Sequence, residues 1–176
     1  MKHYPFDFKQ EANIIVATFT TVTNTQYRVY FYPCQEYFTN INTDSNLYRS
    51  CYFFGFTKLS PNERKIEPID LKVRNTILSI IHQFFSIRGQ DHYLLFFCGN
   101  DDNKNLKRAK CFDLWYRRSD FYNLFVKLDE EIVYYDEQVN TKNYEDLSLI
   151  LPINNPQNER IQEEFLTFKS QLFQNK

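Results

Sequence analysis

Glycine is scarce in this chain, and the scarcity limits the folds and ligand-binding loops that the sequence can form. Only 3 of the 176 residues are glycine. Loops that wrap a phosphate group need glycine, because a side chain would prevent the close approach of the backbone. Neither GxGxxG nor GxxxxGK[ST] can be written in this sequence. A P-loop fold and a dinucleotide-binding Rossmann fold are therefore excluded.

The composition indicates a folded chain that carries little net charge. Apolar residues make up 43% of the sequence and aromatic residues 18%, which is enough to bury a sizeable core. We expect a single α+β domain over residues 1–176. The net charge is −1, so binding to nucleic acid would depend on a local patch.

The apolar runs favour a cytoplasmic protein that does not bind membranes. They are much shorter than the roughly 20 residues that a membrane-spanning helix needs. No apolar segment follows the first residues, as it would in a signal peptide.

Alternating and β-branched segments dominate the first third of the chain and predict an antiparallel meander. Four strands are expected, at residues 4–8, 14–20, 26–32 and 47–59. The segment 37–46, rich in Asn and Thr, predicts a loop. Alternation in the third strand places Tyr30 and Tyr32 on one face of the sheet with Arg28, and Phe31 on the other face.

Capping and helical spacing predict a long helix after the meander. Asp70 is a suitable N-cap, and Gly89 ends the helix. The apolar stripe of this helix consists of Val73, Ile77, Ile80 and Phe84. The apolar run at residues 92–98 then predicts a buried central strand. A second helix follows, and its inward face is expected to consist of Leu106, Ala109, Phe112 and Trp115.

The last third of the chain is expected to form a hairpin, a short strand and a final helix. Segments 124–128 and 132–135 flank an acidic turn at 129–131, and a strand follows at 147–151. Asn155 and Pro156 supply the cap and first turn of the last helix. The predicted fold is thus α+β: N-terminal antiparallel β-meander, helix, central strand, helix, β-hairpin, strand and C-terminal helix.

One resemblance covers most of the chain. The residues that carry it are Asp70, Lys72, Val73, Thr76, Ile77, Ile80, Ile81, Phe84 and Phe85, followed by Cys98, Asp102, Lys104, Arg108, Lys110, Phe112, Trp115 and Tyr116. This pattern resembles an uncharacterised bacterial family that is known only as a domain of unknown function. The resemblance implies no activity.

The predicted order of elements is also similar to the core of the GNAT acetyltransferases. That resemblance implies a glycine-rich loop that binds the coenzyme A pyrophosphate before the long helix, yet residues 65–74 contain no glycine. Asp70 at the helix N-terminus would repel phosphate groups. The family's Asn and Tyr signature falls on Asn105 and Phe112, and phenylalanine has no hydroxyl to protonate a leaving thiolate. A GNAT-like topology is therefore expected at most, without acetyl transfer.

A basic segment is the candidate binding site. Its residues are Lys104, Lys107, Arg108, Lys110, Tyr116, Arg117 and Arg118. Lys104, Lys107 and Arg108 are spaced i, i+3 and i+4 and share one helical face, which could contact phosphates, and Tyr116 could stack on a base. The alternative is a solvated face whose charges pair with acidic residues of the same protein.

The remaining reactive side chains predict no catalytic residue, no metal site and no cofactor. The four cysteines form no CxxC pair, so we expect reduced and mostly buried thiols. Asp101, Asp102 and Asp113 could hold Mg²⁺, but adjacent acids before a helix are more often turn formers. His92 and Cys98 lie roughly 20 Å apart on one strand, too far for a nucleophile and its base.

The sequence therefore favours a binding or regulatory module that engages a protein partner or a second copy of itself. An exposed aromatic surface on the meander would support this hypothesis. The first alternative is nucleic-acid binding through residues 104–118, which requires a continuous positive surface. The second is a divergent GNAT-like acyltransferase, which requires a splayed cleft between the fourth meander strand and the central strand.

Overall fold

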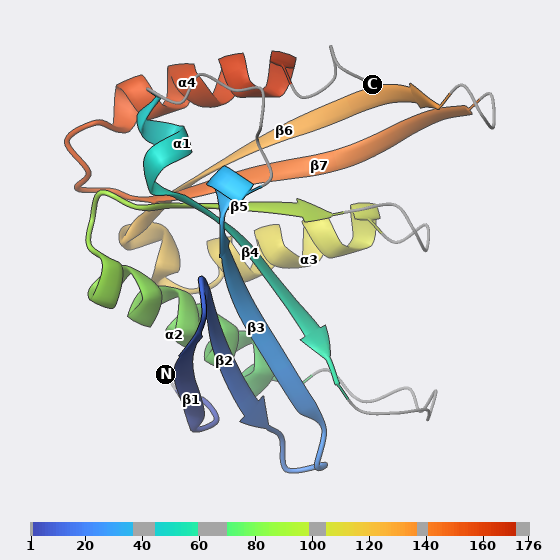
Figure 1. The fold of residues 1–176 in the computed structure, drawn as a ribbon. Helices are drawn as coiled ribbons and strands as arrows, with labels where there is room; N and C mark the ends of the chain where they lie inside the picture. Colours follow the sequence, from blue (N-terminus) through green and yellow to red (C-terminus); the bar gives the residue numbers. More distant parts are fainter. Residues whose placement is uncertain (1, 37–44, 60–69, 99–104, 137–140, 172–176) are drawn as a thin grey trace.

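A computed structural model of the protein describes residues 2–36, 45–59, 70–98, 105–136 and 141–171 (Figure 1). The strands are β1 (Phe6–Glu11), β2 (Ile14–Thr20), β3 (Gln26–Pro33), β4 (Cys51–Lys58), β5 (Tyr93–Cys98), β6 (Phe125–Asp136) and β7 (Thr141–Pro152). The helices are α1 (Asn46–Ser50), α2 (Leu71–Arg88), α3 (Asn105–Arg117) and α4 (Asn158–Gln171), with short 3₁₀ turns η1 (Cys34–Glu36) and η2 (Asp120–Asn123).

The strands form one mixed sheet in the order β1-β2-β3-β4-β5-β7-β6. Neighbouring strands are antiparallel throughout, except that β4 and β5 run parallel. The parallel pair joins an N-terminal meander, β1 to β4, to a C-terminal group of three strands. The predicted α+β class, with a meander and a central strand at β5, is confirmed.

Helices cover both faces of the sheet, so the chain has a core on each side (Figure 1). Helices α2 and α3 pack on one face, where Phe84 of α2 stacks on Phe31 of β3 at 4.5 Å between ring centroids. Helices α1 and α4 pack on the other face, where Phe165 of α4 is 1% exposed. Strand β5 is buried because it lies between these two cores.

The sequence predicted α2 well, because this helix has a strong cap and a clear apolar stripe. The Asp70 side chain accepts a hydrogen bond from the Lys72 backbone N–H at 2.8 Å, and Gly89 ends α2 at a φ of 106°.

The last helix is confirmed, but α4 begins at Asn158, after a turn in which the expected cap Asn155 accepts from the Gln157 N–H at 2.8 Å. In α4, Ile161, Phe165 and Phe168 form the buried face.

The expected fourth strand at 47–59 is wrong at its start, because residues 46–50 form the short helix α1. Ser45 caps this helix by accepting from the Tyr48 N–H at 3.0 Å. The Leu47 N–H donates to a Glu164 carboxylate oxygen of α4 at 2.9 Å. This second contact comes from a residue more than a hundred positions away, so local propensity could not reveal it.

The expected hairpin turn at 129–131 is also wrong, because β6 continues through these acidic residues. Asp129 accepts a hydrogen bond from Ser148 Oγ of β7 at 2.5 Å. Glu130 forms an ion pair with Lys169 of α4 at 2.5 Å. Partners on neighbouring elements thus hold two of the three acids in an extended strand, and the hairpin connects β6 to β7 instead.

The inward face predicted for α3 is correct at Phe112 but wrong at Leu106, which is 53% exposed. Each step of three residues turns a helix by 300°, about 60° short of a full turn, so Leu106 lies about 120° around α3 from Phe112. Among the described residues, no helix has the length and apolar character needed to cross a membrane.

Candidate functional site

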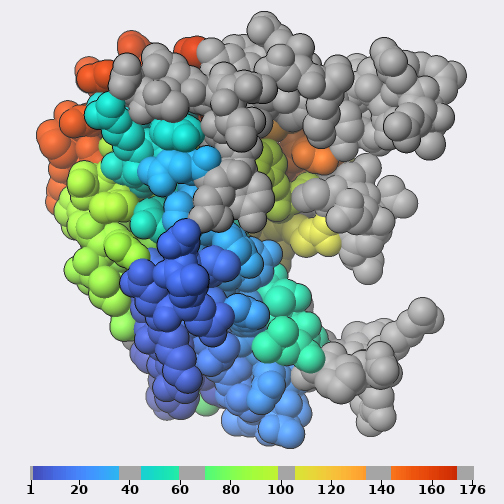
Figure 2. Space-filling model, viewed as in Figure 1, coloured from blue at the N-terminus to red at the C-terminus, as the bar shows by residue number. Residues whose placement is uncertain are grey.

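Strands β4 and β5 separate shortly after they meet, and a cleft opens between them. Their parallel pairing covers three residue pairs, from Cys51 with Tyr93 to Phe53 with Leu95. Beyond these pairs, β4 continues beside β3 and β5 continues beside β7. The resulting cleft has a volume of about 1070 Å³. Figure 2 shows the molecule hollowed on this side, between the blue and teal atoms of β3 and β4 and the yellow atoms of α3.

The cleft has two mainly aromatic walls. One wall comes from the meander and consists of Tyr30, Tyr32 and residues 53–57. The other comes from β5 and α3 and consists of residues 96–98, Arg108, Cys111, Phe112 and Trp115. Since successive residues of a strand face opposite sides of the sheet, the cleft presents aromatic rings on both sides.

Gly55 shapes the meander wall, because the ring of Tyr30 lies directly over it. Tyr30 and Gly55 are cross-strand partners. A Cβ atom at residue 55 would lie 2.4 Å from Tyr30 Cε2, so any side chain there would force the Tyr30 ring to move. The absence of a side chain therefore lets the Tyr30 ring lie flat on β4. There it meets the Tyr32 ring edge-on, with 5.2 Å between the ring centroids.

The backbone of β4 and β5 contributes to the cleft as well as their side chains do. Residues 54–57 of β4 pair with β3 on their outer side, and residues 96–98 of β5 pair with β7 on theirs. In a strand, backbone N–H and C=O groups point alternately to both sides. The edges that face the cleft therefore carry backbone groups that no described strand pairs, and such edges bind extended chains readily.

Arg108 is the one charged side chain among the described residues that line the cleft. It projects from α3 on the side of Cys98, whose pKa its positive charge lowers. The dominant effect on that thiol is burial, and the pKa of Cys98 rises to about 11. The thiol is therefore protonated and uncharged at neutral pH.

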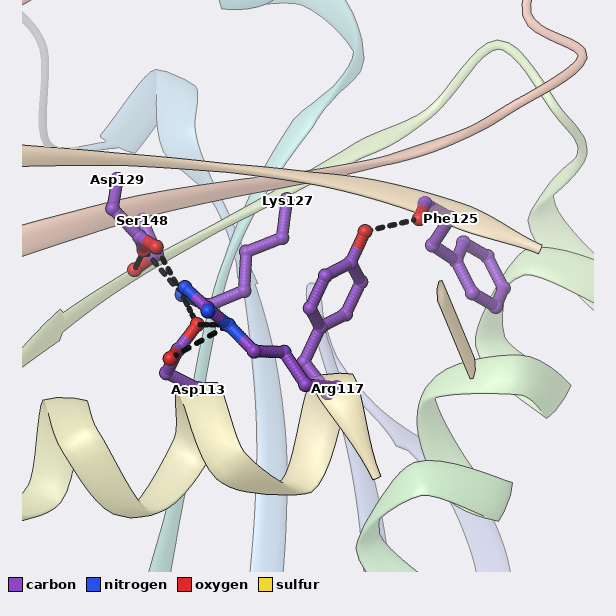
Figure 3. A network of polar contacts seen from close by, with 7 residues as sticks. Asp113, Arg117, Phe125, Lys127, Asp129 and Ser148 are labelled. Carbon is purple, nitrogen blue, oxygen red and sulfur yellow. Dashed lines mark hydrogen bonds and ion pairs between the residues drawn. The ribbon is translucent and has the colours of Figure 1, made fainter. Parts of the chain in front are cut away.

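A polar network beside the cleft fastens α3 to the sheet (Figure 3). The Lys127 side chain of β6 is 3% exposed and forms an ion pair with Asp129. Its Nζ lies 3.9 Å from Asp113 of α3, which also pairs with Arg117 at 3.0 Å. Burial raises the pKa of the nearby Asp146, Glu131 and Asp129 raise it further, and Lys127 lowers it. The network is structural, because none of its residues lines the cleft.

The described residues of the predicted basic site lie on α3 and directly after it. All five of its described Lys and Arg residues are exposed. Arg108 also lines the cleft, and Arg117 pairs with Asp113. The Tyr116 hydroxyl donates to the Phe125 carbonyl oxygen at 3.0 Å, and its ring packs against the core. Lys104, Asp101 and Asp102 lie outside the described residues. Asp113 belongs to the Lys127 network, and the described residues hold no group of ligands suited to a metal ion.

Sequence reasoning named a cleft between these strands only as what an acyltransferase would require, and it noted the tyrosines of β3 without placing them there. Their predicted position opposite Phe31 is confirmed, since Phe31 is fully buried whereas both tyrosines are partly exposed. Gly55 was the available signal, because a glycine inside a strand marks a close approach of another group. No local sequence pattern indicates that β4 and β5 diverge.

The thiols should differ in their reactivity with iodoacetamide. All four cysteines are free, and Cys111 is exposed whereas the other three are buried. A pKa of about 11 in place of 9.0 lowers the thiolate fraction of Cys98 about 100-fold near pH 8. We therefore expect Cys111 to be alkylated first, with Cys98 labelled only after unfolding, as measured by peptide mass spectrometry. Equal labelling of Cys98 and Cys111 in the folded protein would contradict this placement.

Comparison with known proteins gives one match. A family model described as a family of unknown function, DUF6169, matches residues 69–167. This segment runs from the start of α2 into α4 and includes the β5 and α3 wall of the cleft. No curated protein matches the chain, and no solved structure matches it either.

Proposed function

We propose that this chain, which belongs to the family of unknown function DUF6169, is a non-catalytic binding module whose cleft takes an extended segment of a protein partner. The observation that carries this proposal is the separation of β4 and β5 after three residue pairs. It leaves two strand edges facing one another across aromatic walls. An added strand gains affinity from main-chain hydrogen bonds and specificity from pockets for alternate side chains.

The aromatic walls support a segment with apolar side chains. The ring centroids of Phe53 and Phe97 lie 5.4 Å apart on one side of the sheet. Those of Phe56 and Trp115 lie 6.1 Å apart on the other side. A segment between the strands would direct alternate side chains to these two groups. Aromatic anchors in a concave site contribute much of the binding energy in protein interfaces.

The test is to select short peptides that bind the protein from a library and then follow amide hydrogen exchange. We expect bound peptides to protect amides in residues 54–57 and 96–98, because their backbone groups become paired. The Gly55→Ala variant displaces the Tyr30 ring and should weaken binding about tenfold or more. Tyr122→Ala is the matched control, since Tyr122 is 51% exposed and lies outside the cleft.

Two outcomes would count against a peptide-binding cleft. In the first, the selected peptides protect backbone amides in strands other than β4 and β5. In the second, the Gly55→Ala variant binds the peptides as tightly as the unchanged protein does. A loss of folding in Gly55→Ala is checked by its thermal unfolding, and Tyr32→Ala then serves as the second cleft variant. The Tyr32 ring centroid lies 5.2 Å from that of Tyr30, and the three atoms nearest to a Cβ at residue 55 all belong to Tyr30.

An acyl-coenzyme A ligand is the second candidate, because β4 and β5 are parallel and splay after an antiparallel meander, as the GNAT resemblance implies. Two contacts weigh against it. The Asp70 carboxylate occupies the N-terminus of α2, accepting from Lys72 N–H at 2.8 Å and from the Tyr4 hydroxyl at 2.6 Å. Phe112 is 3% exposed and has no proton to donate. A thermal shift with acetyl-coenzyme A would favour this candidate over a peptide ligand.

Nucleic-acid binding has less support from the geometry of α3. The exposed side chains of Leu106 and Leu114 interrupt its basic residues. Arg117 is paired with Asp113, and Tyr116 is held by the Phe125 carbonyl. A continuous line of phosphate contacts would need these groups on one surface.

A further inference from the structure

We infer that Cys34 and Cys51 form a site of reversible oxidation, at which a small disulfide such as glutathione disulfide converts the two thiols into an intramolecular disulfide bond. This inference does not depend on what the cleft binds. It starts from the positions of the two residues in the sheet. Pro33 of β3 pairs with Tyr52 of β4, and one further step along both segments places Cys34 opposite Cys51.

The distance between opposite residues of an antiparallel pair suits a disulfide. Their Cα atoms lie about 4.5–5.5 Å apart, and a disulfide joins Cα atoms that are about 4.4–6.8 Å apart. Both cysteines belong to the buried core that α1 and α4 cover, and neither is more than 1% exposed. Burial raises the pKa of Cys34, and a hydrogen bond with the Cys51 thiol raises this pKa further. The two thiols are therefore in contact and protonated at neutral pH.

The other two cysteines lie away from this pair. Cys98 belongs to the core on the opposite face of the sheet, and Cys111 is exposed on α3, which packs on that same face. All four cysteines are free thiols in the structure. Because the sheet stands between the two cores, a bond from Cys34 or Cys51 to either of the others would require unfolding.

The reaction consists of two thiol–disulfide exchanges. The thiolate of one cysteine attacks a sulfur of the small disulfide and releases one small thiol, which leaves a mixed disulfide on the protein. The other cysteine then loses its proton, attacks the protein sulfur of the mixed disulfide and releases the second small thiol. The two protein thiols thus lose two protons and two electrons, which the two released thiols carry.

Burial should make this oxidation slow in the folded protein. The thiolate is the attacking species, and a buried thiol is mostly protonated. Leu47 of α1 belongs to the same buried core as both cysteines, so the small disulfide reaches them when this short helix opens locally. The fully exposed thiol of Cys111 should therefore react before the pair does.

The bond would also stabilise the fold. It would close a loop that contains η1 and α1, and it would join β3 to β4 where Cys51 begins to pair with Tyr93 of β5. A disulfide stabilises a protein mainly by restricting the unfolded chain. We expect the oxidised protein to unfold about 5–10 °C above the reduced protein.

The experiment uses the Cys111→Ser variant, which lacks the exposed thiol. This protein is incubated with glutathione disulfide in urea below its unfolding transition, and the remaining thiols are alkylated after denaturation. Peptide mass spectrometry should find the Cys34 peptide linked to the Cys51 peptide, with Cys98 alkylated. The thermal midpoint should rise as stated, and dithiothreitol should reverse both changes. When Cys34→Ala is added as the matched control, no linked peptide should form and the midpoint should not rise.

Three results would overturn this inference. The first is a pair that stays reduced in the folded protein although the same oxidant links it in denaturing urea. The second is a bond from either residue to Cys98, or a glutathione adduct that persists on Cys34 or Cys51. The third is an oxidised protein that unfolds at a lower temperature than the reduced protein, because the native arrangement would then resist the bond.

Discussion

The Phe84→Ala variant is expected to lose about 3–5 kcal/mol of unfolding free energy. The Phe84 side chain is fully buried where α2 meets the sheet. Its ring lies 4.5 Å from Phe31 of β3 and 5.1 Å from Tyr52 of β4, measured between centroids. Truncation removes the apolar burial and leaves a cavity that rigid strands cannot fill. Urea unfolding followed by the fluorescence of Trp115 would measure the loss.

Ile87→Ala is the matched control for this prediction. Ile87 lies on the same helix, three residues on, but is 58% exposed. Its truncation should cost less than about 1 kcal/mol, as is usual for exposed positions. Similar losses in the two variants would show that α2 does not pack on the sheet through Phe84.

The Lys127→Met variant is expected to lose about 2 kcal/mol, and the loss should depend on pH. The Lys127 side chain is 3% exposed and lies between Asp129 and Asp113. Removing it leaves Asp129 without this cation and Asp113 with Arg117 alone, and breaking an ion pair costs about 3–5 kcal/mol when both partners are buried. The smaller value applies because Asp129 is 53% exposed and Asp113 30%, so that water screens both charges.

The pH dependence separates this loss of charge from a loss of packing. Burial raises the pKa of Asp146 and Lys127 lowers it, so the substitution raises this pKa further. A group whose pKa is raised in the folded state favours folding below its unfolded pKa and disfavours it as pH increases through the folded value. The destabilisation should therefore shrink as the pH falls toward 4. Equal destabilisation at neutral and acidic pH would contradict the electrostatic explanation.

Adding Asp129→Asn to Lys127→Met provides a second check. The amide keeps the shape of the Asp129 side chain and removes one of the uncompensated charges. The double variant should therefore be less destabilised than the sum of the two single variants. Additive losses would show that Lys127 and Asp129 do not interact as their ion pair indicates.

The sequence predicted those elements whose stability is local. Asp70, the apolar stripe and Gly89 define α2 within a single segment, and the burial of Ile77, Ile80 and Phe84 follows from helical spacing. Strand β5 was recognisable from its continuous apolar run, because a strand covered on both faces shows no alternation.

The elements that depend on distant partners could not be predicted. Residues 129–131 resemble a turn until Ser148 and Lys169 are placed beside them. The cleft is further removed from local information, since it arises where two strands stop pairing. Arg108 was singled out with its neighbours as a basic surface, but its position at the cleft depends on how α3 is rotated against the sheet.

Phe112 is a buried residue that can set the width of the cleft. Its ring lies 6.2 Å from Phe54 of β4 and 4.6 Å from Phe96 of β5, so this buried side chain stands as a spacer between the two walls. Only three residue pairs tie the strands together elsewhere. Since Phe112 also lines the cleft, a smaller or larger residue at this position would alter both the distance between the walls and the lining itself. The thickness of an accepted ligand can thus evolve through this one residue.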